Sequence, residues 1–226
     1  MSRSSMAAVF LVVLIAINVV CLSPQGATAA PEGELHKLNL ELPPPLPPGK
    51  EPSTEAYRFT QQVCDFGTST FTEQMIGARC YDVLIPYGES FKGNQVKATQ
   101  VATIILVTKI QALTSEAYAI RDMGIRVENI NNCGSFFAIG ETFSDTTNST
   151  LYALERLTAA GEGKRSKEDL ETVHKWTKNL ETQYDETASK CKLGDLFKYG
   201  DKKVPTVWVI DLLTTTAIRL LNAIKP

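Results

Sequence analysis

The sequence predicts an all-α protein, an antiparallel four-helix bundle preceded by a short helical hairpin that a disulfide closes. Three observations lead to this prediction. Apolar residues recur at spacings of three and four over four long stretches of the chain, which is the pattern of amphipathic helices. Short connections join these stretches, which favours antiparallel neighbours. No run of alternating polar and apolar residues competes as a sheet.

Residues 1–29 have the pattern of a secretory signal peptide. Arg3 supplies a positive charge, the sixteen residues from Ala7 to Leu22 are apolar apart from Asn18, and Ala27-Thr28-Ala29 matches a cleavage site. A retained membrane anchor is the alternative, but this run is shorter than the roughly 20 residues that a spanning helix needs. We therefore expect a secreted protein that has no membrane contact after cleavage.

The net charge and length of the mature chain bear on its function class and domain number. Loss of the leader removes one of 23 basic residues and none of 25 acidic residues, so the net charge becomes −3 (22 − 25). Proteins that bind nucleic acid usually carry a basic stripe, and this balance gives no reason to expect one. The 197 residues that remain (226 − 29) are enough for one domain with a hydrophobic core.

A proline-rich spacer is expected over residues 30–53. The run Pro43-Pro44-Pro45-Leu46-Pro47-Pro48 favours an extended polyproline II conformation, because each proline ring fixes φ and removes a backbone donor. A stiff linker is the interpretation that we favour over a ligand for a proline-binding module or a wall-associated stalk. The folded domain is then expected over residues 54–226.

The domain is expected to begin with short helical pieces between Tyr57 and Leu84, joined by a turn and closed by Cys64 and Cys80. Four long helices follow. The first starts near Val96, is apolar nearly all round in its middle, and ends at Gly124, so it should be the most buried. The other three are expected from Arg126 to Thr158, from Ser166 as N-cap to Cys191, and from near Pro205 to Ile224.

Cysteine usage indicates disulfides. The leader removes Cys21, so five cysteines become four in a compartment that permits oxidation. Three pairings are possible in principle, and four free thiols are the alternative. A zinc site is a poor interpretation, because C-x-x-C and clustered histidines are missing.

The expected helix directions select one pairing. Cys133 lies near the start of the second long helix and Cys191 near the end of the third, and both fall on apolar seams. The start of one helix of an antiparallel hairpin lies beside the end of the next, so we predict a Cys133–Cys191 disulfide and a Cys64–Cys80 disulfide. The chain-entropy model gives roughly 3 kcal/mol for the shorter loop and roughly 4 for the longer one.

Catalytic patterns are weak, and the sequence predicts no catalytic group, cofactor or metal. The run Gly161-Glu162-Gly163-Lys164-Arg165-Ser166 lacks the first glycine of a phosphate-binding loop, and no strand precedes it. His174 lies one helical turn from Glu171 and from Lys178, as expected on a solvated face. Asn148-Ser149-Thr150 is an N-glycosylation sequon, so we expect a glycan on Asn148 that faces solvent.

With its leader, its cysteine-closed N-terminal hairpin and four helices carrying a second cysteine pair, the chain resembles the plant invertase/pectin methylesterase inhibitor family over roughly residues 57–225. The similar segments are Cys64-Asp65-Phe66-Gly67-Thr68, Cys80-Tyr81-Asp82-Val83-Leu84, Asn132-Cys133-Gly134-Ser135-Phe136-Phe137, Val173-His174-Lys175-Trp176 leading to Cys191, and Leu220-Leu221-Asn222-Ala223-Ile224. A Pro-Lys-Phe tripeptide, which the family's invertase inhibitors use at the target's active site, is missing.

The resemblance implies a secreted apoplastic inhibitor that lays a helical face over the substrate cleft of a cell-wall enzyme. Its protein partner would be pectin methylesterase or acid invertase, and the missing tripeptide favours pectin methylesterase. Two alternatives stay open. One is a bundle that binds an apolar ligand beside Gly140, Ser144 and Thr147, and the other is a structural wall protein without inhibitory activity. The oligomeric state is not predicted.

Overall fold

The computed structural model describes residues 42–67, 70–122, 133–134, 139, 145–161, 163–190 and 207–225. The chain divides into two compact units at residues 38 and 39, and every described residue belongs to the second. The predicted signal peptide and the first part of the predicted spacer lie outside the described residues. Within these residues, all regular structure is helical, which confirms the predicted fold class.

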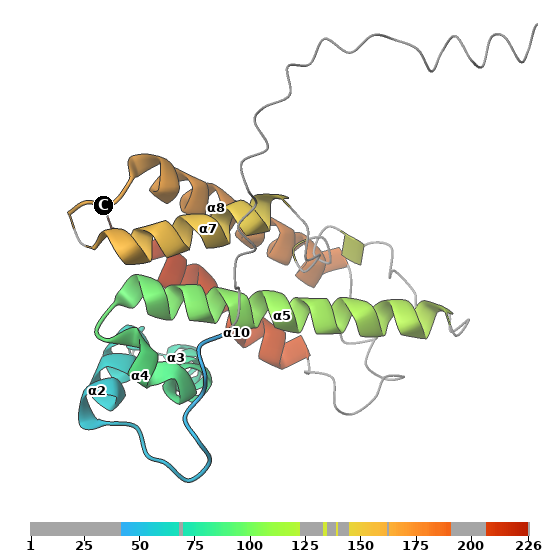
Figure 1. Cartoon of the computed structure of the whole chain (residues 1–226). Coiled ribbons are helices and arrows are strands. Elements are labelled where there is room, and N and C mark those ends of the chain that lie inside the picture. Colours follow the sequence, from blue (N-terminus) through green and yellow to red (C-terminus); the bar gives the residue numbers. More distant parts are fainter. Residues whose placement is uncertain are drawn as a thin grey trace, which may run out of the picture. The chain divides into compact units, whose positions relative to one another are not determined.

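Four long helices form the predicted antiparallel bundle (Figure 1). Each packs against two others, in the cyclic order α5, α7, α8, α10. The start of α5 lies beside the end of α7, where the Asn94 side-chain amide donates to the carbonyl of Thr158 at 3.1 Å. The bounds of the four helices are α5 Gln95–Asp122, α7 Asp145–Ala160, α8 Lys167–Lys190 and α10 Val207–Asn222.

Helix α5 lies in the core, as its apolar pattern predicts. Leu106, Ile110 and Leu113 are almost fully buried, and the helix contacts α7, α10 and α3. Asn94 caps its start, because its side-chain oxygen accepts the backbone N–H of Lys97 at 3.1 Å. By length and composition α5 is also apolar enough to cross a membrane. Most of that stretch is buried inside the domain, as is usual for a core helix.

Buried threonines are tolerated in this core because they bond to their own helices. The hydroxyl groups of Thr99, Thr103 and Thr114 donate to the backbone carbonyl four residues earlier, at 2.8 to 2.9 Å. Such a bond satisfies the hydroxyl donor without a partner from another helix. Threonine can therefore occupy the apolar stripe of a helix, where the side chain presents its methyl group to the core.

A short turn joins α7 to α8. Gly161 and Gly163 have φ values of 71° and 78°, in the left-handed region that favours glycine. Ser166 caps α8 as predicted, and its hydroxyl accepts the backbone N–H of Asp169 at 3.4 Å. Of the predicted second helix, the part from Asp145 onward forms α7, and nearly all of the earlier part lies outside the described residues. The expected helix starts and ends at Gly124, Arg126, Cys191 and Pro205 also lie outside them.

The hairpin consists of α2 (Thr54–Val63) and α3 (Phe71–Leu84). Helix α3 begins with a capping box, in which Thr70 and Glu73 each accept the other's backbone N–H. A short 3-10 turn η1 (Ile85–Tyr87) and helix α4 (Gly88–Phe91) lead from the hairpin into α5. Helix α3 packs against both α10 and α5, so the hairpin rests on the bundle.

The described part of the proline-rich segment contacts the domain. Leu42 packs against the hydrophobic core, and the backbone N–H of Leu46 donates to the carbonyl of Pro86 at 2.7 Å. Ser53 then caps α2 by accepting the N–H of Ala56 at 3.2 Å. Residues 42–53, the described part of the stiff spacer that the sequence predicts, therefore lie along the helical domain.

Candidate protein-binding surface

The predicted disulfide between Cys64 and Cys80 is present and links α2 to α3. Their Cα atoms are 5.5 Å apart, and both side chains are buried. A buried disulfide of this kind is structural, because a reactive thiol needs exposure and a stabilised thiolate. Cys133 is buried and also disulfide-bonded. Its predicted partner Cys191 lies outside the described residues, so that pairing stays a prediction.

Gly77 permits the close approach of the two hairpin helices. A Cβ atom at this position would lie 2.9 Å from the backbone oxygen of Cys64. Side chains essentially never approach a backbone oxygen so closely, so any larger residue would push α3 away from the end of α2. Gly77 precedes Cys80 by one helical turn and thus keeps the two helices at the distance that the disulfide bridges.

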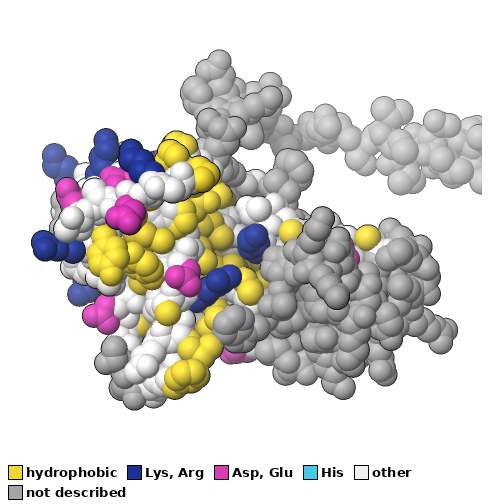
Figure 2. All heavy atoms as spheres, turned by 90° about the horizontal axis from the view of Figure 1, so that it is seen from below, with side chains coloured by type: hydrophobic (Ala, Val, Ile, Leu, Met, Phe, Trp, Pro, Cys, Tyr) yellow, Lys and Arg dark blue, Asp and Glu magenta, His cyan; other side chains and the backbone are white. Residues whose placement is uncertain are grey.

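Two aromatic side chains of the hairpin are exposed. Phe71 is 76% exposed and Tyr57 is 43% exposed, and they are the two large hydrophobic residues that are exposed in the described part of the chain. The rings of Tyr57 and Tyr81 meet edge to face with centroids 5.6 Å apart. Figure 2 views the molecule from below Figure 1 and shows hydrophobic side chains among Lys, Arg, Asp and Glu. Aromatic residues are enriched at protein interfaces relative to the rest of the surface.

Two polar contacts hold the hairpin in its position. The Glu89 carboxylate on α4 accepts the backbone N–H of Ser53 at 2.6 Å and its hydroxyl at 3.2 Å. These two hydrogen bonds lower the pKa of Glu89. At the other end of α2, the Arg219 guanidinium from α10 lies 5.3 Å from the ring centroid of Phe66. These contacts hold the hairpin against α4 and α10 near both ends of α2.

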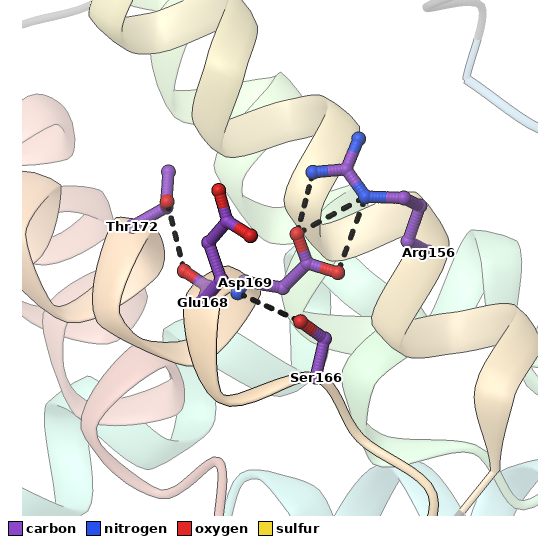
Figure 3. A network of polar contacts seen from close by, with 5 residues as sticks. All are labelled: Arg156, Ser166, Glu168, Asp169 and Thr172. Carbon is purple, nitrogen blue, oxygen red and sulfur yellow. Dashed lines mark hydrogen bonds and ion pairs between the residues drawn. The ribbon is translucent and has the colours of Figure 1, made fainter.

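An ion pair joins α7 to α8 near their connecting turn (Figure 3). The Nε atom of Arg156 lies 3.0 and 3.1 Å from the two carboxylate oxygens of Asp169, and Nη2 donates to one of them. The Asp169 side chain is 8% exposed and that of Arg156 is 60% exposed. The hydrogen bonds to this carboxylate raise the pKa of Arg156. The backbone N–H of Asp169 donates to the Ser166 hydroxyl, while the Asp169 carboxylate binds Arg156.

Comparison with known proteins places the chain in a family. Over 182 aligned residues, 79% of this chain and 80% of the other, it is 38% identical to an uncharacterised protein of rice (Oryza sativa subsp. japonica). This chain belongs to the family of that rice protein. No protein-family model matches the chain, and no solved structure matches it.

In this member of the rice protein's family, the described residues offer no recognisable catalytic constellation. No three His, Cys, Asp or Glu side chains among them are placed to hold a metal ion. His174 is exposed on α8, as expected, and His36 lies outside the described part. Burial raises the pKa of Asp211 on α10.

The predicted glycosylation sequon lies in the first turns of α7. Asn148 is half-buried, Ser149 is exposed and Thr150 is buried. The hydroxyl of Thr150 donates to the carbonyl of Thr146 at 2.9 Å. The expected glycan on Asn148 stays a prediction. Half-burial of Asn148 leaves less room for a glycan than the fully solvent-facing position that the sequence led us to expect.

Of the three positions expected to leave a cavity for an apolar ligand, Thr147 is described. It is buried, and its hydroxyl accepts the indole N–H of Trp176 at 3.2 Å. The same hydroxyl donates to the carbonyl of Ile139 at 3.4 Å. Thr147 thus takes part in a polar contact between α7 and α8. Gly140 and Ser144 lie outside the described residues.

Proposed function

We propose that this protein is a secreted inhibitor of a plant cell-wall carbohydrate-active enzyme, with pectin methylesterase as its target. The observation that carries the proposal is the arrangement of a disulfide-closed helical hairpin on an antiparallel four-helix bundle. The plant invertase/pectin methylesterase inhibitor family, which the cysteine-containing segments resemble, has this arrangement. The relative in rice supports a plant setting.

The mode of action follows from what the surface offers. An inhibitor that covers a substrate cleft needs a rigid, complementary face and no catalytic group of its own. Such a face gains affinity when it is ordered before binding, because little conformational entropy is lost. The disulfide and the Ser53–Glu89 contact give the hairpin this kind of order. Exposed Tyr57 and Phe71 supply aromatic anchors of the type that dominates binding energy at protein interfaces.

The choice of target rests on the sequence. The Pro-Lys-Phe tripeptide of the family's invertase inhibitors is missing from this chain. Acid invertase is therefore the second candidate, and pectin methylesterase the first.

The test is a titration of the oxidised, secreted protein against purified pectin methylesterase and purified acid invertase at apoplastic pH. We expect stoichiometric loss of pectin methylesterase activity at micromolar inhibitor and unchanged invertase activity. Loss of invertase activity alone would reassign the target. If neither enzyme loses activity, the inhibitor proposal is wrong and a structural wall role becomes the better account.

Two variants of α3 test whether an exposed aromatic side chain of the hairpin contributes to inhibition. Phe71→Ala removes the most exposed aromatic side chain of the hairpin and should not affect folding, because that side chain makes few contacts with the core. Thr72→Ala changes the neighbouring exposed position on α3 and is the control. We expect the first variant to weaken inhibition and the second to leave it unchanged.

A further inference from the structure

Two tyrosines of the hairpin lie in contact at the protein surface. Tyr57 is on α2 and Tyr81 is on α3, and their ring centroids are 5.6 Å apart with the rings edge to face. Tyr57 is 43% exposed and Tyr81 is half-buried, so solvent reaches the pair. Two phenols in contact differ from other aromatic pairs, because one-electron oxidation of each allows a covalent bond to form between the rings.

The packing of the hairpin holds these two rings together. Tyr57 precedes Cys64 by seven residues (64 − 57), so both lie on one face of α2, about two helical turns apart. Tyr81 directly follows Cys80, which is the disulfide partner of Cys64. The Tyr81 ring packs against the hydrophobic core, whereas the more exposed ring of Tyr57 has room to tilt toward it. A bond between the rings therefore joins α2 to α3 at a second point, on the same face of α2 as the disulfide.

The two hydroxyl groups differ in their surroundings. The side-chain amide of Gln61 donates to the Tyr57 hydroxyl oxygen at 3.0 Å, and both side chains are exposed. Since this oxygen acts as an acceptor, the Tyr57 O–H can pass its proton to water. Burial first, and then Tyr57 and Asp82, raise the pKa of Tyr81, so its phenol is protonated at neutral pH. Oxidation of Tyr81 must therefore release a proton together with the electron.

We propose that Tyr57 and Tyr81 form a site of oxidative cross-linking, at which a haem peroxidase and hydrogen peroxide join the two rings as dityrosine. Each phenol loses one electron and its hydroxyl proton, which gives two phenoxyl radicals. The radicals combine in a C–C bond between carbons next to the phenolic oxygens. The two hydrogens on those carbons then move to the oxygens as protons, which restores both phenols. For each bond, two protons and two electrons leave the protein, and one hydrogen peroxide takes them up to give two water molecules.

The cross-link acts on the hairpin as the disulfide does. It closes a loop from residue 57 to residue 81 and so limits the freedom of the unfolded chain. It differs from the disulfide in that a thiol reductant does not break a C–C bond. This site goes beyond the proposed enzyme inhibition and does not rest on it, because the bond forms without a target enzyme.

Treatment of the disulfide-bonded, secreted protein with a haem peroxidase and limiting hydrogen peroxide tests this proposal. After reduction of the disulfides, trypsin cleavage after Lys and Arg places Tyr57 in peptide 51–58 and Tyr81 in peptide 80–92. We expect mass spectrometry to find these two peptides joined, at their summed mass less two hydrogen atoms, in protein that stays monomeric. The fluorescence of dityrosine should appear in the same fraction.

Phenylalanine variants assign the bond to its two residues. Tyr57→Phe and Tyr81→Phe keep the packed rings and remove the phenol, and each should abolish the joined peptide. Tyr87→Phe is the matched control, because Tyr87 lies on η1 within the same peptide as Tyr81 and is also half-buried. This control should leave the yield of the joined peptide unchanged.

Three results would overturn the proposal. They are treated monomer in which the two peptides stay separate, cross-links that form only between molecules, and a joined peptide that persists in Tyr57→Phe or Tyr81→Phe. Inhibition of pectin methylesterase is measured on untreated protein. A failure to cross-link therefore leaves the proposed function as it stands, and a failure to inhibit leaves the cross-linking site as it stands.

Discussion

Asp169 is buried in the first turn of α8, and Arg156 is its only ion-pair partner among the described residues. Arg156→Ala would leave that carboxylate without its cationic partner. We expect the free energy of unfolding to fall by about 1–3 kcal/mol, the cost of a buried polar group left unsatisfied. Urea unfolding at neutral pH measures this change.

The exposed pair of Lys167 and Glu171 on the same helix provides the matched control. Its side chains are 91% and 68% exposed. Lys167→Ala should therefore cost no more than about 0.5 kcal/mol, as is usual for an exposed pair one turn apart on a helix. Equal losses in the two variants would contradict the account of Asp169 as a buried carboxylate that depends on Arg156.

Because the pKa of Asp211 is raised, we expect the stability of the protein to depend on pH. Burial raises its pKa, so the folded state holds this proton more tightly than the unfolded state. The contribution to stability is full below the ordinary pKa of 3.8 and is lost as the pH rises through the raised value. Asp211→Asn should therefore be more stable than the unchanged protein at neutral pH, by no more than about 0.5 kcal/mol.

Thermal unfolding of the Asp211→Asn protein between pH 3 and pH 7 checks this expectation. The advantage of the variant should shrink as the pH falls and disappear once Asp211 is protonated in both states. Asp185→Asn, at an exposed position on α8, serves as the control. An advantage for Asp211→Asn that grows toward low pH would have the wrong sign for a buried carboxyl.

The hairpin depends on the contact between α2 and α3 at Gly77. Gly77→Ala places a methyl group against the backbone oxygen of Cys64, and we expect a loss of about 1–3 kcal/mol, as for other overpacked sites. Gly134→Ala is the control, because a Cβ atom there meets nothing within 4 Å. Chemical unfolding of both variants under oxidising conditions measures the difference. A neutral effect of Gly77→Ala would mean that the two helices separate without cost.

The apolar periodicity predicts a helix well where the periodic apolar residues are also the ones that the helix buries against its neighbours. Helices α5 and α8 begin within a residue of their expected starts. The apolar periodicity of α5 begins at Val96, and the Ser166 side chain caps α8. The capping box at Thr70 and Glu73 has the sequence pattern T-x-x-E, but the Ser and Thr residues around it equally favour a turn.

The contacts of the proline-rich segment could not be predicted from local sequence patterns. Its composition indicates an extended backbone without internal hydrogen bonds, and this reasoning gives no information on distant partners. The contact from Leu46 to Pro86 joins residues forty positions apart in sequence (86 − 46), and it needs the surface that η1 and α4 create. A long-range contact of this kind follows from the assembled domain.

Across the whole molecule, the apolar periodicity was the most informative feature for the fold, and the Cys64–Cys80 disulfide confirms the predicted closure of the hairpin. The candidate surfaces were harder to predict. In the sequence, Tyr57 and Phe71 are not distinguished from other apolar residues of interrupted amphipathic segments. Their exposure follows from the way in which the hairpin packs on α10 and α5.

We propose that this protein works by covering the cleft of its target enzyme. Initial-rate kinetics of pectin methylesterase, measured over a range of pectin concentrations at several inhibitor concentrations, test this most directly. We predict that the apparent KM rises linearly with inhibitor concentration while kcat stays unchanged, because pectin and inhibitor compete for one cleft. A fall in kcat at constant KM, or unchanged kinetics at micromolar inhibitor, would contradict it.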